Sequence, residues 1–157
     1  MPVVHTPSRV SPRPARFQRG VMLIEALIAL LIFSIGILGI IGLQASAVQQ
    51  STDAKNRAEA AYLADQLMGR MWSDNRTVAN LQANYDMNTC GTTCAGMTSW
   101  FTTLQSTLPG VVATGDTNPQ VQVDASGVVT IQIYWRAPNE PPTSPPHHFD
   151  IQAQIGQ

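Results

Sequence analysis

An apolar run from Val21 to Leu43 constrains this chain more than any other feature. The run holds 23 residues with a single charged side chain, Glu25. Even the 18 residues from Ala26 onward would span roughly 27 Å as an α-helix, enough to cross the hydrocarbon core of a bilayer with little tilt. The sequence therefore predicts a membrane-spanning helix, followed by a soluble part of roughly a hundred residues that holds one small core.

The segment before the run, residues 1–20, contains four prolines, four arginines and no acidic residue. It cannot bury a core, so we expect it to be disordered. Basic residues beside a membrane helix remain on the cytoplasmic side. We therefore expect a protein that crosses the membrane once, with its N-terminus in the cytoplasm and its C-terminal domain outside.

The rest of the chain is acidic. After Gly20 there are five basic and ten acidic residues. This balance favours solubility and gives no electrostatic basis for coating nucleic acid, although a local contact with DNA stays open.

A cleavable secretory signal is an alternative interpretation of the apolar run, because Ala45-Ser46-Ala47 resembles a signal-peptidase site. Two features count against it. The run is longer than the roughly 7–15 apolar residues of such signals, and a carboxylate lies within it.

Glu25 is also costly in an ordinary membrane anchor. A carboxylate at the centre of a bilayer costs about 2.5–3.5 kcal/mol on insertion scales, and less near the ends of the helix. The residue therefore indicates a function that needs a partner for the charge. A simpler interpretation is a first-turn carboxylate favoured by the helix dipole, and both can hold together.

The arrangement of Gly20, four apolar residues (V-M-L-I), Glu25 and a long apolar helix behind a basic leader resembles the class III signal of type IV prepilins and type II secretion pseudopilins. The resemblance implies that a prepilin peptidase cuts between Gly20 and Val21 and that Val21 is N-methylated. It also implies that Glu25 pairs with the N-terminal charge of a neighbouring subunit and sets its register. Val21 stands where this family most often has Phe.

Beyond residue 43 the pattern predicts a head domain built on the same helix. No proline occurs between Pro14 and Pro109, so we expect the helix to run from about 21 to 73. Residues 60–71 carry an apolar stripe at helical spacing, and residues 97–108 predict a short amphipathic helix. Three alternating segments predict antiparallel strands: 121–123, 129–135 and 149–155, the first two joined by the turn Asp124 to Gly127. Residues 73–96 and 137–146 are expected to be loops.

The predicted fold is α+β, with a small antiparallel sheet packed on the C-terminal half of the long helix. Its parts are a leader (1–20), an apolar transmembrane or fibre-core helix (21–43) and a head (44–157). The segments "AAYLADQLMGRMWSDN" (60–75) and "WFTTLQSTLPG" (100–110) make this order similar to PilV-type minor pilins. The resemblance implies a type IV pilin-like fold and a minor pilin that primes assembly or remains at the fibre tip. Its implied partners are other minor pilins, the major pilin and the inner-membrane assembly platform.

Two other functions stay open at this stage. A minor pseudopilin of type II secretion would share the N-terminal motif and the helix stripe. A recognition module would instead use the loops at 73–96 or 137–146 to bind DNA or a surface.

The remaining candidate residues predict little chemistry. Cys90 and Cys94, in C-G-T-T-C, indicate either a disulfide outside the cytoplasm or two free thiols, and only weakly a zinc site. His148 and Asp150 lack an accompanying nucleophile or metal-ligand motif. We therefore expect no enzyme, no cofactor and no metal, and we expect Trp72 and Trp100 to belong to the core.

Overall fold

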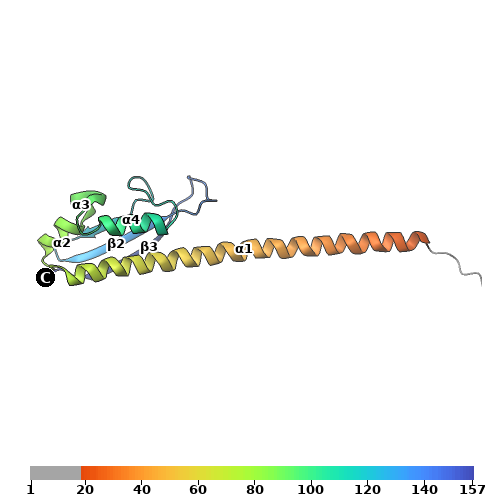
Figure 1. The fold of residues 1–157 in the computed structure, drawn as a ribbon, viewed down its shortest axis with the longest axis horizontal. Helices are drawn as coiled ribbons and strands as arrows, with labels where there is room; N and C mark the ends of the chain where they lie inside the picture. The colour runs from red at the N-terminus through yellow and green to blue at the C-terminus, as the bar shows by residue number, and fades with distance from the viewer. Residues whose placement is uncertain (1–18) are drawn as a thin grey trace, which may run out of the picture. The chain divides into compact units, whose positions relative to one another are not determined.

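The computed structural model describes residues 19–157, with side chains from Val21 onward (Figure 1). The predicted leader lies outside the described residues except for Arg19 and Gly20, the first two residues of helix α1. This helix, Arg19–Ser73, is continuous over 55 residues, which confirms the predicted long helix and its end. The chain divides into two units, Met1–Ala47 and Val48–Gln157, and each is described by itself.

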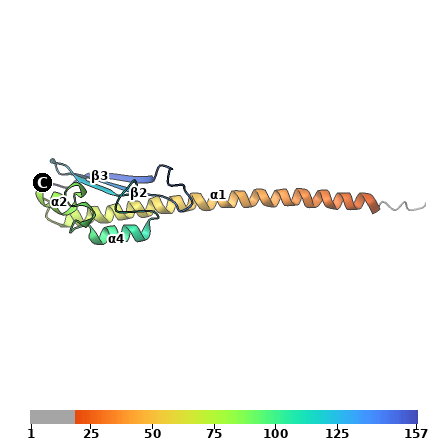
Figure 2. The same ribbon diagram turned by 90° about the horizontal axis from the view of Figure 1, so that it is seen from above.

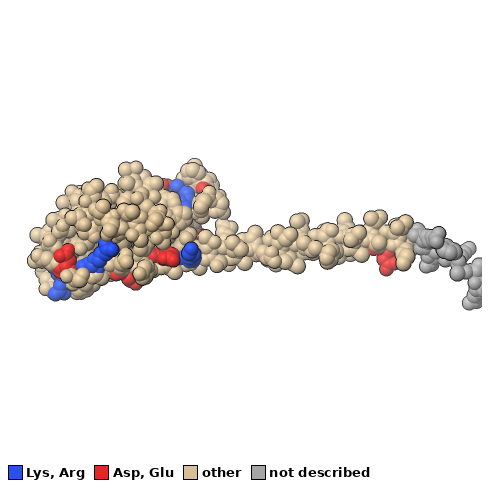
Figure 3. All heavy atoms as spheres, in the orientation of Figure 1, with Lys and Arg blue, Asp and Glu red and all other residues tan. Residues whose placement is uncertain are grey.

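In the first unit, every side chain from Val21 to Ala47 is exposed. The most apolar stretch of 18 residues has a mean hydropathy of 2.8, and none of it is buried. Figure 3 shows this part of α1 almost free of charged atoms. By length and composition, the helix is able to span a membrane.

The second unit contains a three-stranded antiparallel sheet, as predicted, and its strands lie in the order β1-β2-β3. Its strands are β1 (Gln120–Val123), β2 (Val128–Trp135) and β3 (His147–Gln154). The turn between β1 and β2 closes with a hydrogen bond of 3.1 Å from the Gly127 amide to the Asp124 carbonyl oxygen. Gly127 has a φ of 82°, and a Cβ added there would lie 2.5 Å from Gly156, so the turn requires a glycine.

The core of the second unit forms where the apolar stripe of α1 meets the sheet and helix α4 (Thr98–Thr107) (Figure 2). Side chains at alternate positions of β2 are buried, as expected for a sheet with one face on the core. Helix α4 is fixed by Trp100, whose Nε1 donates to the Leu63 carbonyl oxygen at 2.8 Å. The buried stripe consists of Ala60, Leu63, Ala64, Leu67, Met68 and Met71.

The prediction of a polar loop over residues 73–96 was wrong. This segment contains α2 (Val78–Tyr85), α3 (Met87–Cys90) and a 3-10 turn, η1 (Gly91–Thr93). Leu81 and Tyr85 are both buried, but a helix of 8 residues offers only two turns of periodicity. Abundant Asn and Thr hid that signal, because these residues favour turns as readily as helices.

The prediction for Trp72 was also wrong. Its side chain is 49% exposed, and the Arg76 guanidinium lies 5.4 Å from its ring centroid. The apolar stripe ends at Met71, so the next residue faces away from the core. Trp100, by contrast, is fully buried as predicted.

Candidate functional site

The first turns of α1 carry the residues that the sequence singled out. Val21 and Glu25 are four residues apart, so they lie one above the other on the helix surface. The face that they share is otherwise apolar and consists of Val21, Ile24, Glu25, Ile28, Ala29 and Ile32.

This face has no covering within the described chain. Val21, Ile24 and Ile28 are 62%, 59% and 51% exposed. No side chain in residues 21–157 forms an ion pair or hydrogen bond with Glu25. The helix therefore presents a lone carboxylate in an apolar surface, one turn from the predicted cutting site.

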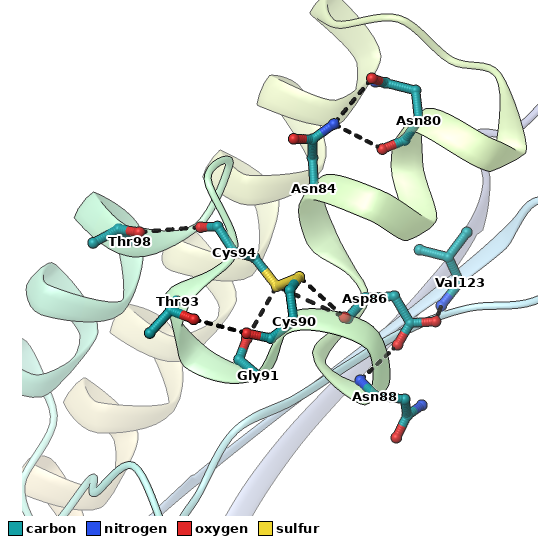
Figure 4. Close-up of a disulfide and its surroundings, with 10 residues drawn as sticks. All are labelled: Asn80, Asn84, Asp86, Asn88, Cys90, Gly91, Thr93, Cys94, Thr98 and Val123. Carbon is teal, nitrogen blue, oxygen red and sulfur yellow. Dashed lines mark hydrogen bonds between the residues drawn. A yellow bond between two sulfur atoms is a disulfide. The ribbon is translucent and has the colours of Figure 1, made fainter.

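A second cluster lies around Asp86, where α2 meets α3 (Figure 4). Asp86 is 7% exposed, and its Oδ1 accepts the Asn88 amide at 2.8 Å, which caps α3. Its Oδ2 lies 3.4 Å from the amide nitrogen of Val123 in β1. Asp86 was not singled out in the sequence, because an Asp before a four-residue helix has no periodic pattern behind it to mark it as an N-cap. Asp86 fastens the helical segment to the sheet.

Cys90 and Cys94 are joined by a disulfide in this cluster, with their Cα atoms 5.1 Å apart. The Cys90 Sγ lies 3.3 Å from the Asp86 carbonyl oxygen. A disulfide sulfur carries no proton to donate, so this is a packing contact. The bond closes the short segment that follows the Asp86 cap.

Tyr85 ties α2 to the end of α1. Its hydroxyl donates to Asp74 Oδ2 at 2.9 Å, and its ring packs so closely on Gly96 that a Cβ there would lie 2.4 Å from it. Burial, together with the hydrogen bond to the Asp74 carboxylate, raises the pKa of Tyr85 to about 12. The phenol is therefore a neutral structural donor.

At the other end of the sheet, Arg136 connects two loops. Its guanidinium pairs with Asp116 and donates to the Ser144 carbonyl oxygen at 2.7 Å. The hydrogen bond from Arg136 lowers the pKa of Asp116. No role was predicted for Arg136, because nothing in the neighbouring sequence marks a contact between these two loops.

The proline-rich loop is closed by a second pair. Glu140 lies 2.7 Å from His147 Nε2, and this hydrogen bond lowers the pKa of Glu140. The His147 ring also stacks on Trp135, with centroids 5.8 Å apart. These contacts hold the loop against the sheet. Glu140 and His147 therefore both have structural partners.

His148 and Asp150 share the outer face of β3, and their side chains are 60% and 66% exposed. The distance from His148 Nε2 to Asp150 Oδ1 is 3.9 Å. Across the described residues, no group of three His, Cys, Asp or Glu side chains is placed to hold a metal ion.

Comparison with known proteins gives no further constraint. No protein-family model matches this chain, and no curated protein or solved structure matches it.

Proposed function

We propose that this chain is the precursor of a minor subunit of a type IV pilus. In this proposal the leader is removed between Gly20 and Val21 by a prepilin peptidase and the new N-terminus is methylated. The single apolar helix first holds the protein in the inner membrane, with the head in the periplasm, and then enters the fibre core.

One observation carries the proposal: the lone carboxylate of Glu25 on an uncovered apolar helix face. Cutting before Val21 would create an α-ammonium one helical turn from that carboxylate. Each charge is costly in an apolar bundle, and a pair formed between neighbouring subunits reduces that cost. Because only one axial offset brings the two groups together, Glu25 would set the register of the subunit.

The layout of the head supports the same proposal. A small antiparallel sheet packs on the C-terminal part of the helix that carries the cutting site, which is a pilin-like arrangement. The disulfide suits a head outside the cytoplasm. We propose that the head contacts other minor pilins and the major pilin, with the inner-membrane assembly platform as the site of insertion, and acts in priming the fibre or at its tip.

A minor pseudopilin of a type II secretion system would share all these features, so the experiment must separate the two. Fibres sheared from the host cell surface are purified and probed for this chain, and protein secretion is measured in a deletion strain. A pilus subunit copurifies with the sheared fibres, and its deletion leaves secretion intact. Loss of secretion, with no chain in the sheared fibres, would contradict the pilus assignment and favour the pseudopilus.

A further inference from the structure

The two edges of the sheet differ in their protection. At the β1 edge, the Val123 carbonyl oxygen accepts a hydrogen bond of 3.0 Å from Gln82 Nε2, and the Val123 amide lies 3.4 Å from Asp86 Oδ2. Helices α2 and α3 therefore cap that edge with side chains. Proteins protect exposed edges in this way because an open edge is a template for pairing with another chain.

The β3 edge has no comparable cap in the described chain. The Ile155 amide donates to the Gly127 carbonyl oxygen at 3.0 Å, and hydrogen-bonded pairs recur at every second residue of an antiparallel ladder. Phe149, Ile151 and Ala153 therefore bond to β2. The backbone groups of the alternate residues, His148, Asp150 and Gln152, point away from β2, and no backbone or side-chain group in residues 21–157 bonds to them.

The inner face of β3 is also incompletely covered. Phe149 and Ile151 are only partly buried, whereas their partners in β2, Ile133 and Ile131, are fully buried. A further strand beside β3 would bury the exposed parts of these side chains and pair the open backbone groups together.

The charge on this edge indicates what kind of strand would pair there. Asp150 has a 66% exposed side chain, and no Lys or Arg in the described residues pairs with it. Oppositely charged side chains stabilise neighbouring strands, and like charges directly opposite destabilise them. None of the strands β1, β2 and β3 contains Lys or Arg, so a second copy of this sheet offers only histidine to Asp150. The Nε2 atom of His148 already lies 3.9 Å from Asp150 Oδ1 within the same strand. A permanently charged Lys or Arg must therefore come from a different chain.

We propose that β3 is a docking edge for an extended segment of a different protein, which adds to the sheet as a fourth strand. The segment alternates apolar and polar residues, covers Phe149 and Ile151, and places Lys or Arg beside Asp150. Main-chain hydrogen bonds supply affinity in this mode of recognition, and side chains supply specificity. The inference concerns the head alone and does not depend on the processing of Val21.

The test uses the full chain in its native host, with the photo-crosslinker p-benzoyl-phenylalanine replacing His148. Gln152→Pro removes one outward amide and leaves the hydrogen bonds to β2 intact, since edge strands tolerate proline at such positions. Gln152→Ala is the matched control, because it removes the same side chain and its 3.0 Å hydrogen bond to Thr130 but keeps the amide. Thermal unfolding of each variant checks that the head is folded.

We expect adducts with a protein other than this chain, joined through a segment that alternates and contains Lys or Arg. Gln152→Pro lowers the yield about tenfold, as loss of one main-chain bond predicts, whereas Gln152→Ala keeps it within about twofold. Asp150→Lys, at a position outside the core, also lowers the yield about tenfold and serves if the proline variant does not fold. Equal yields in all variants, adducts only with a second copy, or no adduct would each overturn the proposal.

Discussion

Two stretches of helix α1 differ in whether the chain covers their apolar side chains. In residues 60–71 of α1, the apolar side chains follow one stripe, and Leu67 and Met71 are fully buried. In residues 21–43 apolar side chains surround the helix, and all are exposed; Leu31, for example, is 62% exposed.

The difference shows what each part of the helix requires. A stripe leaves a polar face for water, so the chain itself supplies the core that covers it. A helix that is apolar all round has no such face and needs lipid or other subunits on every side. The chain itself therefore covers the apolar side chains of the head, whereas those of residues 21–43 are left for lipid or other subunits to cover.

Glu25→Ala should produce the largest effect. It should lower incorporation into fibres without changing the stability of the head. If Glu25 pairs with a neighbour's ammonium, its removal leaves a charge unpaired in the fibre core. That costs about 3–5 kcal/mol, more than a hundredfold in incorporation. Quantifying the chain in sheared fibres against the membrane pool measures the effect.

Asp65→Ala is the matched control, because it removes an exposed carboxylate from the part of α1 that lies in the head. It should leave incorporation unchanged, and Glu25→Ala should leave the unfolding free energy of the head unchanged. If Glu25→Ala is incorporated as well as the wild type, Glu25 does not set the register of the subunit.

Leu67→Ala should lower the stability of the head. Deleting a fully buried Leu side chain leaves a cavity and lowers the unfolding free energy by about 3 kcal/mol. Leu31→Ala makes the same chemical change at an exposed position of the other stretch, and should change the unfolding free energy by less than about 0.5 kcal/mol. Urea titration of the detergent-solubilised chain measures the unfolding free energy of both variants. Equal losses for Leu67→Ala and Leu31→Ala would contradict the contrast between the buried and the exposed stretch of α1.

Replacing Cys90 and Cys94 together with Ser should have a smaller effect. A disulfide that closes so short a loop contributes at most about 2 kcal/mol through the entropy of the unfolded chain. Urea titration of the double variant measures the loss, which should lie in the head and leave incorporation within about twofold. A loss as large as that of Leu67→Ala would show that the Asp86 cluster fails without the disulfide.

Tyr85→Phe should have the smallest effect, about 1 kcal/mol at neutral pH, from loss of the hydrogen bond to Asp74. Its pH dependence is the sharper test. The pKa of Tyr85 is raised from 10.0 to about 12 in the folded protein, so its contribution is complete below pH 10 and is lost as the pH rises towards 12. Unfolding free energies of wild type and Tyr85→Phe should therefore fall with different slopes above pH 10, and parallel curves would contradict the assigned role.

The sequence predicted the parts whose signal is periodic. The stripe of α1, helix α4 and the three strands each repeat a pattern over several residues. Helix α2 was missed because Leu81 and Tyr85 give too few repeats, and α3 was missed because a helix of 4 residues is too short to show a repeat. Asp86 and Arg136 were missed because their partners, Val123 and Asp116, are distant in sequence, and only the folded chain brings them together.

The candidate N-terminal site, by contrast, is evident in the sequence, and the fold adds little to it. Gly20, Val21 and Glu25 stand out in the sequence by their order alone. The fold adds that Val21 and Glu25 share a helix face with no partner in the described chain. Their roles still depend on processing and on a second subunit.

The mass of the mature N-terminus tests the central claim most directly. The chain is isolated from the membrane of its native host, digested, and its first peptide is sequenced by mass spectrometry. The proposal predicts a chain that begins at Val21 and carries one N-methyl group. A chain that begins at Val48, after Ala45-Ser46-Ala47, or one that keeps residues 1–20, would contradict it.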